Sequence, residues 1–154
     1  MLDTPQIETT DAELTAIIRL EVKKEKMQQV FGPSVEELIS TVAEQGGEVT
    51  GPVFAHHFRM DPDVFDFAIG VPVSESIEST KRVEASELPA MKVARTVYHG
   101  PYDGLPDAWS EFHKWIEEQG FEFESDAVER YVLGPESDPD PSNWETELVR
   151  PLET

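Results

Sequence analysis

The acidic residues near the end of the chain are the first candidates for chemistry. The segment WETELV, residues 144–149, alternates as a β-strand does, with Glu145 and Glu147 on one side. Val149 shares that side and Thr146 lies among the apolar residues, so the alternation leaves open which side is buried. A carboxylate in apolar surroundings loses its hydration, and a lipophilic cation relieves that cost. The segment therefore offers either the solvated side of a strand or an anionic site for a cation.

The other reactive side chains form no metal or nucleophile pattern. His56 and His57 are adjacent, so on a strand they point to opposite faces, and His113 has no histidine partner one helical turn away. The chain has no cysteine, which removes disulfides, zinc–thiolate sites and thiol nucleophiles. No glycine-rich phosphate loop and no nucleophile-elbow motif occurs. We therefore expect no metal and no cofactor.

The charge balance bears on the partners of the protein. Its 154 residues carry 32 Asp and Glu against 12 Lys and Arg, a formal net charge of −20. A polyanionic surface repels phosphate backbones, so we expect no direct nucleic-acid binding and assign most of the acidic residues to solubility. No stretch resembles a signal peptide or is apolar enough to span a bilayer, so we expect a cytoplasmic protein without membrane contact.

Three landmarks of the sequence occur twice, in the same order. They are Gly32-Pro33 and Gly100-Pro101, Glu44-Gln45-Gly46 and Glu118-Gln119-Gly120, and Pro72-Val73 and Pro151-Leu152. The ordered set predicts a single domain over residues 12–152 made of two similar halves, near residues 12–74 and 84–152. The polar residues 74–87 would connect them.

Each half predicts a strand, a helix and two further strands. In the first half the strands are expected at 16–22, 53–59 and 64–71, with a helix from a capping box at Ser34 and Glu37 to Gly46. In the second half they are expected at 91–98, 128–133 and 144–149, with a helix carrying the stripe Leu105, Trp109, Phe112 and Ile116. Two such units side by side form an α+β fold, one antiparallel sheet with two helices on one face and a ligand cleft between the halves.

Several segments resemble the GyrI-like effector-binding domain. They are VARTVYHGPYDGL, AWSEFHKWIEEQG and DPDPSNWETELVRPL, supported by VFGPSVEELISTVAEQGGEVTGP and FDFAIGVPV in the first half. This small-molecule-binding module also occurs attached to DNA-binding regions in multidrug-sensing and AraC-type transcription regulators. The resemblance covers about residues 14–152. It implies the duplicated fold, with an aromatic-lined cleft into which an acidic residue of the last strand reaches.

The resemblance places that acidic residue at Glu147, in the segment Thr146-Glu147-Leu148. In the repeat Ala68 stands at the equivalent position of the first half, so a second carboxylate is not expected there. From the residues alone, Glu147 could instead be exposed or paired with Arg95, Arg130 or Arg150. The expected aromatic lining consists of Phe58, Phe67, Tyr102, Trp109, Tyr131 and Trp144.

The function implied by the resemblance is the binding of a hydrophobic, cationic small molecule, for effector sensing or sequestration by a stand-alone domain. A buried anion among ring faces suits flat, delocalised cations of many shapes, which predicts a broad ligand range. Two alternatives stay open. One is a hydrolase of strained electrophilic small molecules in the same cleft, although we rank binding above catalysis. The other is a protein-interaction module of the gyrase-inhibitor type, which would have a protein partner.

Overall fold

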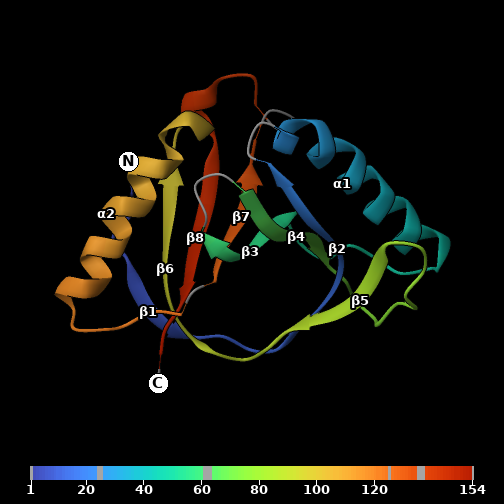
Figure 1. Ribbon diagram of the computed structural model, residues 1–154, viewed down its shortest axis with the longest axis horizontal. Coiled ribbons are helices and arrows are strands. Elements are labelled where there is room, and N and C mark those ends of the chain that lie inside the picture. The colour runs from blue at the N-terminus through green and yellow to red at the C-terminus, as the bar shows by residue number, and fades with distance from the viewer. Residues whose placement is uncertain (1, 24–25, 61–63, 125, 135–137, 154) are drawn as a thin grey trace.

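The chain forms an antiparallel sheet of eight strands in the order β1-β6-β8-β7-β3-β4-β2-β5 (Figure 1). The computed structural model describes residues 2–23, 26–60, 64–124, 126–134 and 138–153. The strands are β1 (Gln6–Thr9), β2 (Glu13–Lys23), β3 (Phe54–Met60), β4 (Val64–Pro72), β5 (Val83–Leu88), β6 (Lys92–His99), β7 (Ala127–Leu133) and β8 (Glu145–Pro151). The helices are α1 (Met27–Glu44) and α2 (Leu105–Glu118), with the 3-10 turns η2 (Tyr102–Gly104) and η3 (Pro141–Asn143).

The sheet consists of two strand–helix–strand–strand units, β2-α1-β3-β4 and β6-α2-β7-β8. The units meet where β3 pairs with β7, and on both sides of this seam the strands follow in the same order. At the seam His57 lies opposite Ala127, and Ala55 lies opposite Glu129. The predicted α+β architecture, one antiparallel sheet with two helices, is confirmed.

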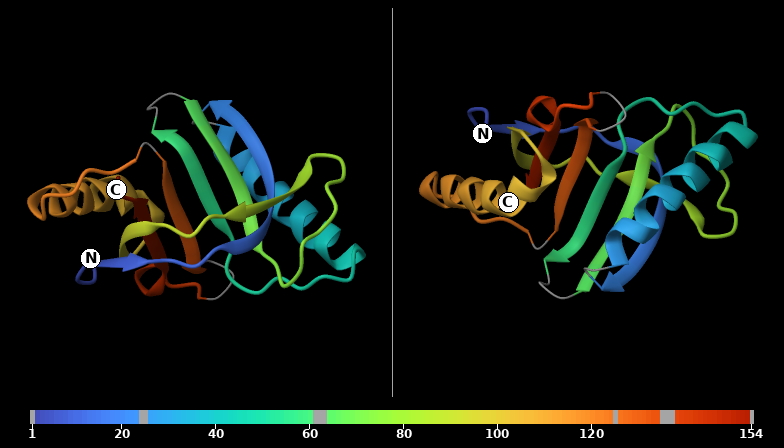
Figure 2. Two further views of the ribbon diagram at one scale, coloured as in Figure 1. Left: turned by 90° about the horizontal axis from the view of Figure 1, so that it is seen from below. Right: turned by 90° about the horizontal axis from the view of Figure 1, so that it is seen from above.

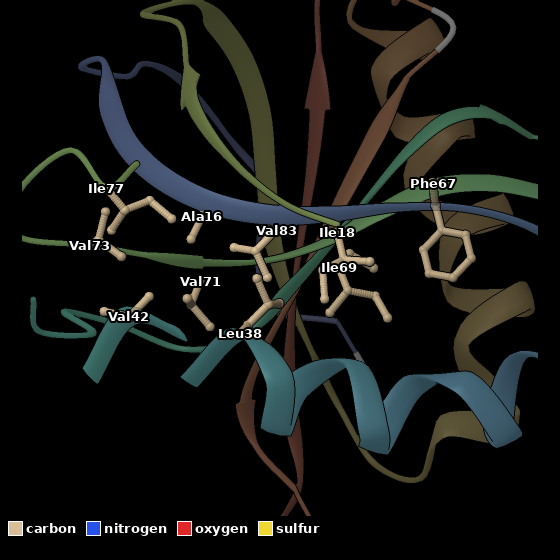
Figure 3. Packing of buried hydrophobic residues seen from close by; sticks show 11 residues of the cluster. Ala16, Ile18, Leu38, Val42, Phe67, Ile69, Val71, Val73, Ile77 and Val83 are labelled. Carbon is tan, nitrogen blue, oxygen red and sulfur yellow. The ribbon is translucent and has the colours of Figure 1, made fainter. Parts of the chain in front are cut away.

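Both helices cover the same face of the sheet, which we call the helix face. Under α1, Leu38 and Val42 pack on a buried cluster from β2 and β4, and Phe67 stands at one end of that cluster (Figure 3). The cluster under α2 contains Ala94, Trp109, Phe112, Ile116, Ala127 and Leu148. Within the described parts of the chain, no helix combines the length and apolar character that crossing a bilayer requires.

The edge strands exchange places between the two units. β1 precedes the first unit but pairs with β6 of the second, whereas β5 precedes the second unit but pairs with β2 of the first. The two connections run alongside each other across the sheet (Figure 2, left), where the Thr10 amide donates to the Met91 carbonyl at 2.8 Å. They cover the other face of the sheet, the back face, whose apolar core is Phe54, Leu88, Val93, Val128 and Val149.

Helix α1 begins earlier than the sequence pattern predicts. The residue that caps it is Lys26, so the capping box at Ser34 is wrong, and Ser34 lies buried within the helix. Pro33 is inside the helix as well, where it cannot donate the usual bond to the carbonyl of Gln29. The helix formers before Pro33 extend the helix nonetheless. Strand β5 also lies largely within the polar stretch that was predicted to be a plain connection.

Arg150 of β8 is buried on the helix face and fully engaged. Its Nε and Nη2 donate to the Glu124 carbonyl at 3.2 and 2.9 Å, and its Nη1 donates to Nε2 of His113 at 3.1 Å. The guanidinium also lies 4.4 Å from the ring centre of Phe123. Because an arginine only donates, His113 accepts this bond in its neutral form. Burial, followed by the Arg150 charge, lowers the pKa of His113 to about 4.

This contact predicts a loss of stability in mild acid. The unfolded chain protonates His113 near its ordinary pKa of 6.5, but the folded protein does so only near 4. The contribution of neutral His113 is therefore complete above pH 6.5 and falls away as the pH drops toward 4. Because His113 is partly exposed, we expect a loss on the order of 2 kcal/mol. Urea unfolding of the wild type and His113→Gln at both ends of this range measures it, since glutamine accepts the bond without titrating. An identical difference between the two proteins at both pH values would contradict the prediction.

Candidate functional site: a buried glutamate among aromatic rings

Glu129 is a charged side chain on the buried side of the central strands. The alternation of β7 points Ala127, Glu129 and Tyr131 toward the helix face. Glu129 is 8% exposed, and its register neighbours are Ala55 and Leu148, both fully buried. The small side chain of Ala55 leaves room for the longer glutamate. Glu129 therefore lies at the seam between the two units.

Three side chains from different elements are directed at the Glu129 carboxylate. The indole Nε1 of Trp109, from α2, donates to Oε2 at 2.9 Å, and the Tyr131 hydroxyl donates to Oε1 at 3.1 Å. His57 Nε2, from β3 in the other unit, lies 3.5 Å from Oε1. The carboxylate is thus held by both units of the fold. Trp109 belongs to the α2 core and contacts the site at the same time.

These partners keep Glu129 ionised despite its burial. Burial alone would raise the pKa of Glu129, but the hydrogen bond and charge of His57, with the Trp109 and Tyr131 donors, outweigh it and leave the pKa below its ordinary value. The pKa of Tyr131 shifts in the opposite direction. Burial and then the Glu129 charge raise its pKa well above 10, so the phenol stays protonated and continues to donate. The site is an anion with a fixed donor beside it.

Aromatic rings from several elements gather around Tyr131. Phe31 of α1 meets its ring edge-on at 5.4 Å, and Tyr102 of η2 lies 5.8 Å away. Trp144, just before β8, lies 4.9 Å from Tyr102. On the β3 side the ring of Phe67 stacks on His57 at 5.4 Å. All of these are ring-centre distances. Tyr131 and His57 contact Glu129, so rings from several distant stretches of the sequence pack on the partners of one carboxylate.

The turn before α2 positions Tyr102 by wrapping around the Tyr98 side chain. The Tyr98 hydroxyl donates to the Pro101 carbonyl at 2.9 Å. A Cβ atom on Gly104 would collide with that hydroxyl, and Gly100 adopts a φ of 140°, which side chains disfavour. Glycine is therefore required at both ends of the turn, and the turn delivers Tyr102 to the site.

A buried hydroxyl group lies beside these rings. Thr146 of β8 is fully buried and opposite both Tyr131 and Tyr98 in the sheet register. Its Oγ1 makes no hydrogen bond within the described part of the chain. A buried polar atom without a partner is costly, so this hydroxyl can gain from a ligand that donates or accepts.

Glu147 lies on the back face, away from this cluster. In the register it stands opposite Arg130 and Val97. It therefore shares the face of Arg130, the residue between Glu129 and Tyr131 whose side chain points to the back face. Its Oε1 lies 3.1 Å from Nε of Arg95 and 3.7 Å from Nε of Arg130. The expectation that Glu147 reaches in among the aromatic residues is therefore wrong. Side chains alternate between the two faces along β8, and Glu147 points to the back face. The arginine-paired reading of this glutamate matches the structure.

Phe58 is the other predicted lining residue that the structure separates from the cluster. Its ring contacts His56 at a centre distance of 4.6 Å and lies under the Arg19 guanidinium at 4.5 Å. Both neighbours belong to the back face, where Arg19 stands opposite Ala68. The other predicted residues, Phe67, Tyr102, Trp109, Tyr131 and Trp144, are all on the helix face around Glu129.

Two hollows lie outside the cluster. The first, about 380 Å³, is on the back face and is bordered by Arg95, Arg130 and Glu147. There Arg95 also approaches Glu8 at 3.4 Å, and Arg130 approaches Glu13 at 3.1 Å. The second, about 390 Å³, lies between the N-terminal residues and the outer side of α2. In the first hollow, each of these glutamates is thus paired with an arginine.

Glu129, His57 and Phe31 are the residues of the cluster that the sequence reasoning missed. One signal was available for the first, since Glu129 and Tyr131 are two apart on a predicted strand and must share a face. The predicted helix start after Gly32 placed Phe31 outside any element. No local pattern reveals His57, because its partner comes from the other half of the chain.

Comparison with known proteins agrees with this fold. A model of the family described as GyrI-like small molecule binding domain matches residues 3–153. No curated protein sequence matches the chain. The C-terminal domain of EcmrR superposes with a TM-score of 0.84 at 18% identity, covering 98% of both chains. In a DNA complex of EcmrR the TM-score is 0.87 at 19% identity, and the match covers 98% of this chain but 57% of the EcmrR chain.

Two further structures share the architecture. A hydrolase encoded by lin2189 from Listeria innocua gives a TM-score of 0.70 at 13% identity, covering 97% of this chain and 91% of that one. SAV2435, in a structure bound to tetraphenylphosphonium, gives 0.67 at 14% identity, covering 98% and 94%. At these identities the likeness concerns the fold alone.

The Trp109 contact predicts different roles for two tryptophans of α2. Trp109→Phe keeps an aromatic ring in the core but removes a donor from the buried Glu129 carboxylate, so the free energy of unfolding should fall by about 1–3 kcal/mol. Trp115 is only partly buried on the flank of the same helix, so Trp115→Phe should change it by about 0.5 kcal/mol or less. Chemical unfolding at neutral pH measures both. Equal losses in the two variants would contradict the assigned hydrogen bond.

Proposed function

Because the chain belongs to the GyrI-like family of small-molecule-binding domains, we propose that it binds a hydrophobic organic cation at Glu129. The observation that carries this proposal is a buried, ionised carboxylate bonded to Trp109 and Tyr131, with further rings packed on Tyr131 and on His57. A lipophilic cation pairs with this carboxylate and gains attraction from ring faces, about 0.5–2 kcal/mol for each contact.

The arrangement of the rings allows a ligand to take the place of one ring–ring contact. Phe31, Tyr102 and Trp144 reach the site from a helix end, a turn and a strand entrance. None of the three lies within a paired strand, so their side chains can rotate without disturbing the sheet pairing. We expect them to part around the ligand while Tyr131 and Trp109 keep Glu129 in place. Ring faces recognise shape only loosely, which supports binding of several different cations.

The biological setting belongs to the same proposal. EcmrR carries a domain of this fold and forms a complex with DNA. Effector sensing on behalf of a DNA-binding partner is therefore one use of such a site, and sequestration of a toxic cation is the other. Both uses need reversible binding without chemistry, and the net charge of −20 favours the approach of cations in either case.

Tetraphenylphosphonium is a suitable probe, because it is a permanent, delocalised cation and is bound in the SAV2435 structure. We expect isothermal titration calorimetry to show binding to the wild type, and Glu129→Gln to weaken it by at least about tenfold, equal to 1.4 kcal/mol. Glu147→Gln is the matched control on the neighbouring strand. It should leave the affinity within about twofold, because its charge faces the opposite side of the sheet.

Either of two results would overturn this assignment. If Glu129→Gln bound the probe as tightly as the wild type, the electrostatic role of Glu129 would be wrong. If Glu147→Gln alone lost affinity, the cation would bind on the back face, as the sequence first suggested. Circular dichroism of each variant excludes loss of the fold as the cause.

Hydrolysis of a strained electrophile is the second candidate function, favoured by the 3.1 Å hydrogen bond between Tyr131 and Glu129. In such a reaction Glu129 takes a proton from water, and the water oxygen bonds to a ring carbon while the carbon–heteroatom bond breaks. The heteroatom takes a proton from Tyr131, and Glu129 then returns its proton to Tyr131 through their hydrogen bond. A carboxylate with a lowered pKa is a weak base, so binding ranks first.

An epoxide such as styrene oxide tests the second candidate. Diol formation above the buffer rate, followed by chromatography and abolished in Glu129→Gln, would establish the hydrolase. We expect diol formation at the buffer rate in both proteins, which would leave binding as the function.

A further inference from the structure

The Glu129 carboxylate has a basic neighbour from the other half of the chain. His57 Nε2 lies 3.5 Å from Oε1, and the two side chains are 8% and 11% exposed. In the sheet register His57 stands opposite Ala127, so it lies diagonally across the seam from Glu129 on the same face. Burial of both groups makes their electrostatic interaction much stronger than that of a surface pair.

The ring of His57 is held in position by its surroundings. The Phe67 ring, from the neighbouring strand β4, stacks on it with an angle of 23° between the planes (Figure 3 shows Phe67). Among the described residues, the ionisable neighbours of the pair include Tyr131 of β7, and Tyr102 of η2 lies next to Tyr131. Trp109 contributes a neutral donor from α2. Because the pKa of Tyr131 lies well above 10, this tyrosine does not change its charge near neutral pH.

We propose that His57 is the internal counter-ion of Glu129, and that a cationic ligand binds in exchange for the proton that His57 carries. This inference rests on the proposed function and goes further, since it states what sets the charge preference of the site. With His57 protonated, Glu129 is neutralised and an incoming cation meets an imidazolium. With His57 neutral, the carboxylate is a buried anion without a compensating charge, the state that a cation stabilises most.

The exchange has a thermodynamic signature. Histidine is the side chain that gains or loses a proton between about pH 5 and pH 8. If binding of a cation expels one proton, linkage requires the affinity to rise with pH, by at most about tenfold for each pH unit. A neutral ligand of similar shape does not repel the imidazolium, so its binding should release no proton. His57 thus distinguishes cations from neutral molecules in a pH-dependent way.

Tetraphenylphosphonium tests this exchange directly, because its own charge does not vary with pH. Calorimetric titrations at about pH 5.5, 7 and 8.5, in buffers of different ionisation enthalpy, count the protons released on binding. We expect a release approaching one proton on the acidic side of the range and an affinity that rises with pH. Triphenylphosphine oxide, the neutral comparison, should bind without proton release.

Two adjacent histidines provide a matched pair of variants. His57→Gln keeps a donor for Glu129 but cannot titrate, so the affinity for tetraphenylphosphonium should become nearly independent of pH. His56→Gln changes the neighbouring residue, which points to the back face and pairs with Asp126 at 2.7 Å. That variant should keep the proton release and the pH dependence of the wild type. If His57→Gln fails to fold, the proton count of the wild type, compared with that of His56→Gln, decides the question.

The outcomes separate this inference from the proposed function. Absence of binding at every pH, or binding that ignores Glu129→Gln, would refute the proposed function and the exchange with it. Binding that depends on Glu129 but releases no proton would refute the exchange alone. The same holds if His57→Gln retains the pH dependence of the wild type.

Discussion

The pairing of β3 with β7 is the constraint on which the rest of the structure depends. This seam joins two units that each provide only half of a sheet, and it brings His57 of one unit next to Glu129 of the other. The helices lie on either side of it, so each can direct one aromatic residue toward the middle, Phe31 from α1 and Trp109 from α2. The site is therefore a consequence of the duplication and exists in neither half alone.

Two glutamates on neighbouring strands show how the local partners of a carboxylate decide its role. Glu147 lies between Arg95 and Arg130, whose positive charge is permanent, so its own charge is compensated under all physiological conditions. Glu129 is held by two neutral donors and one histidine. A histidine, unlike an arginine, is charged only when it carries a proton. A carboxylate paired with arginines fixes the sheet, whereas one paired with a histidine is better suited to receiving a cation.

The sequence predicted the architecture better than the site. The repeated turns and the one-sided stripe of α2 are local patterns, so they identified the two units, whereas the expected aromatic lining came from the family resemblance and was assigned to a cleft at Glu147. The position of Glu147 required knowledge of which side of β8 faces the helices, and Thr146 with Val149 made that ambiguous. The pairing of β8 with β7 settles it by placing Glu147 opposite Arg130. His57 was beyond local reasoning, because its meaning arises only where the two halves pair.

The exchange of edge strands has a consequence for how the chain acquires its structure. Each half borrows its outermost strand from the segment that precedes the other half, as the pairing of Gln6 with Arg95 shows. The first half lacks its edge strand until β5 has emerged, and β1, made first, has no partner until β6 has emerged, so β1 stays unpaired while more than half of the chain is synthesised. The two halves are therefore not separable modules, despite their similar plans. A cut in the connection between them would yield two fragments with open sheet edges, which must find each other again or aggregate.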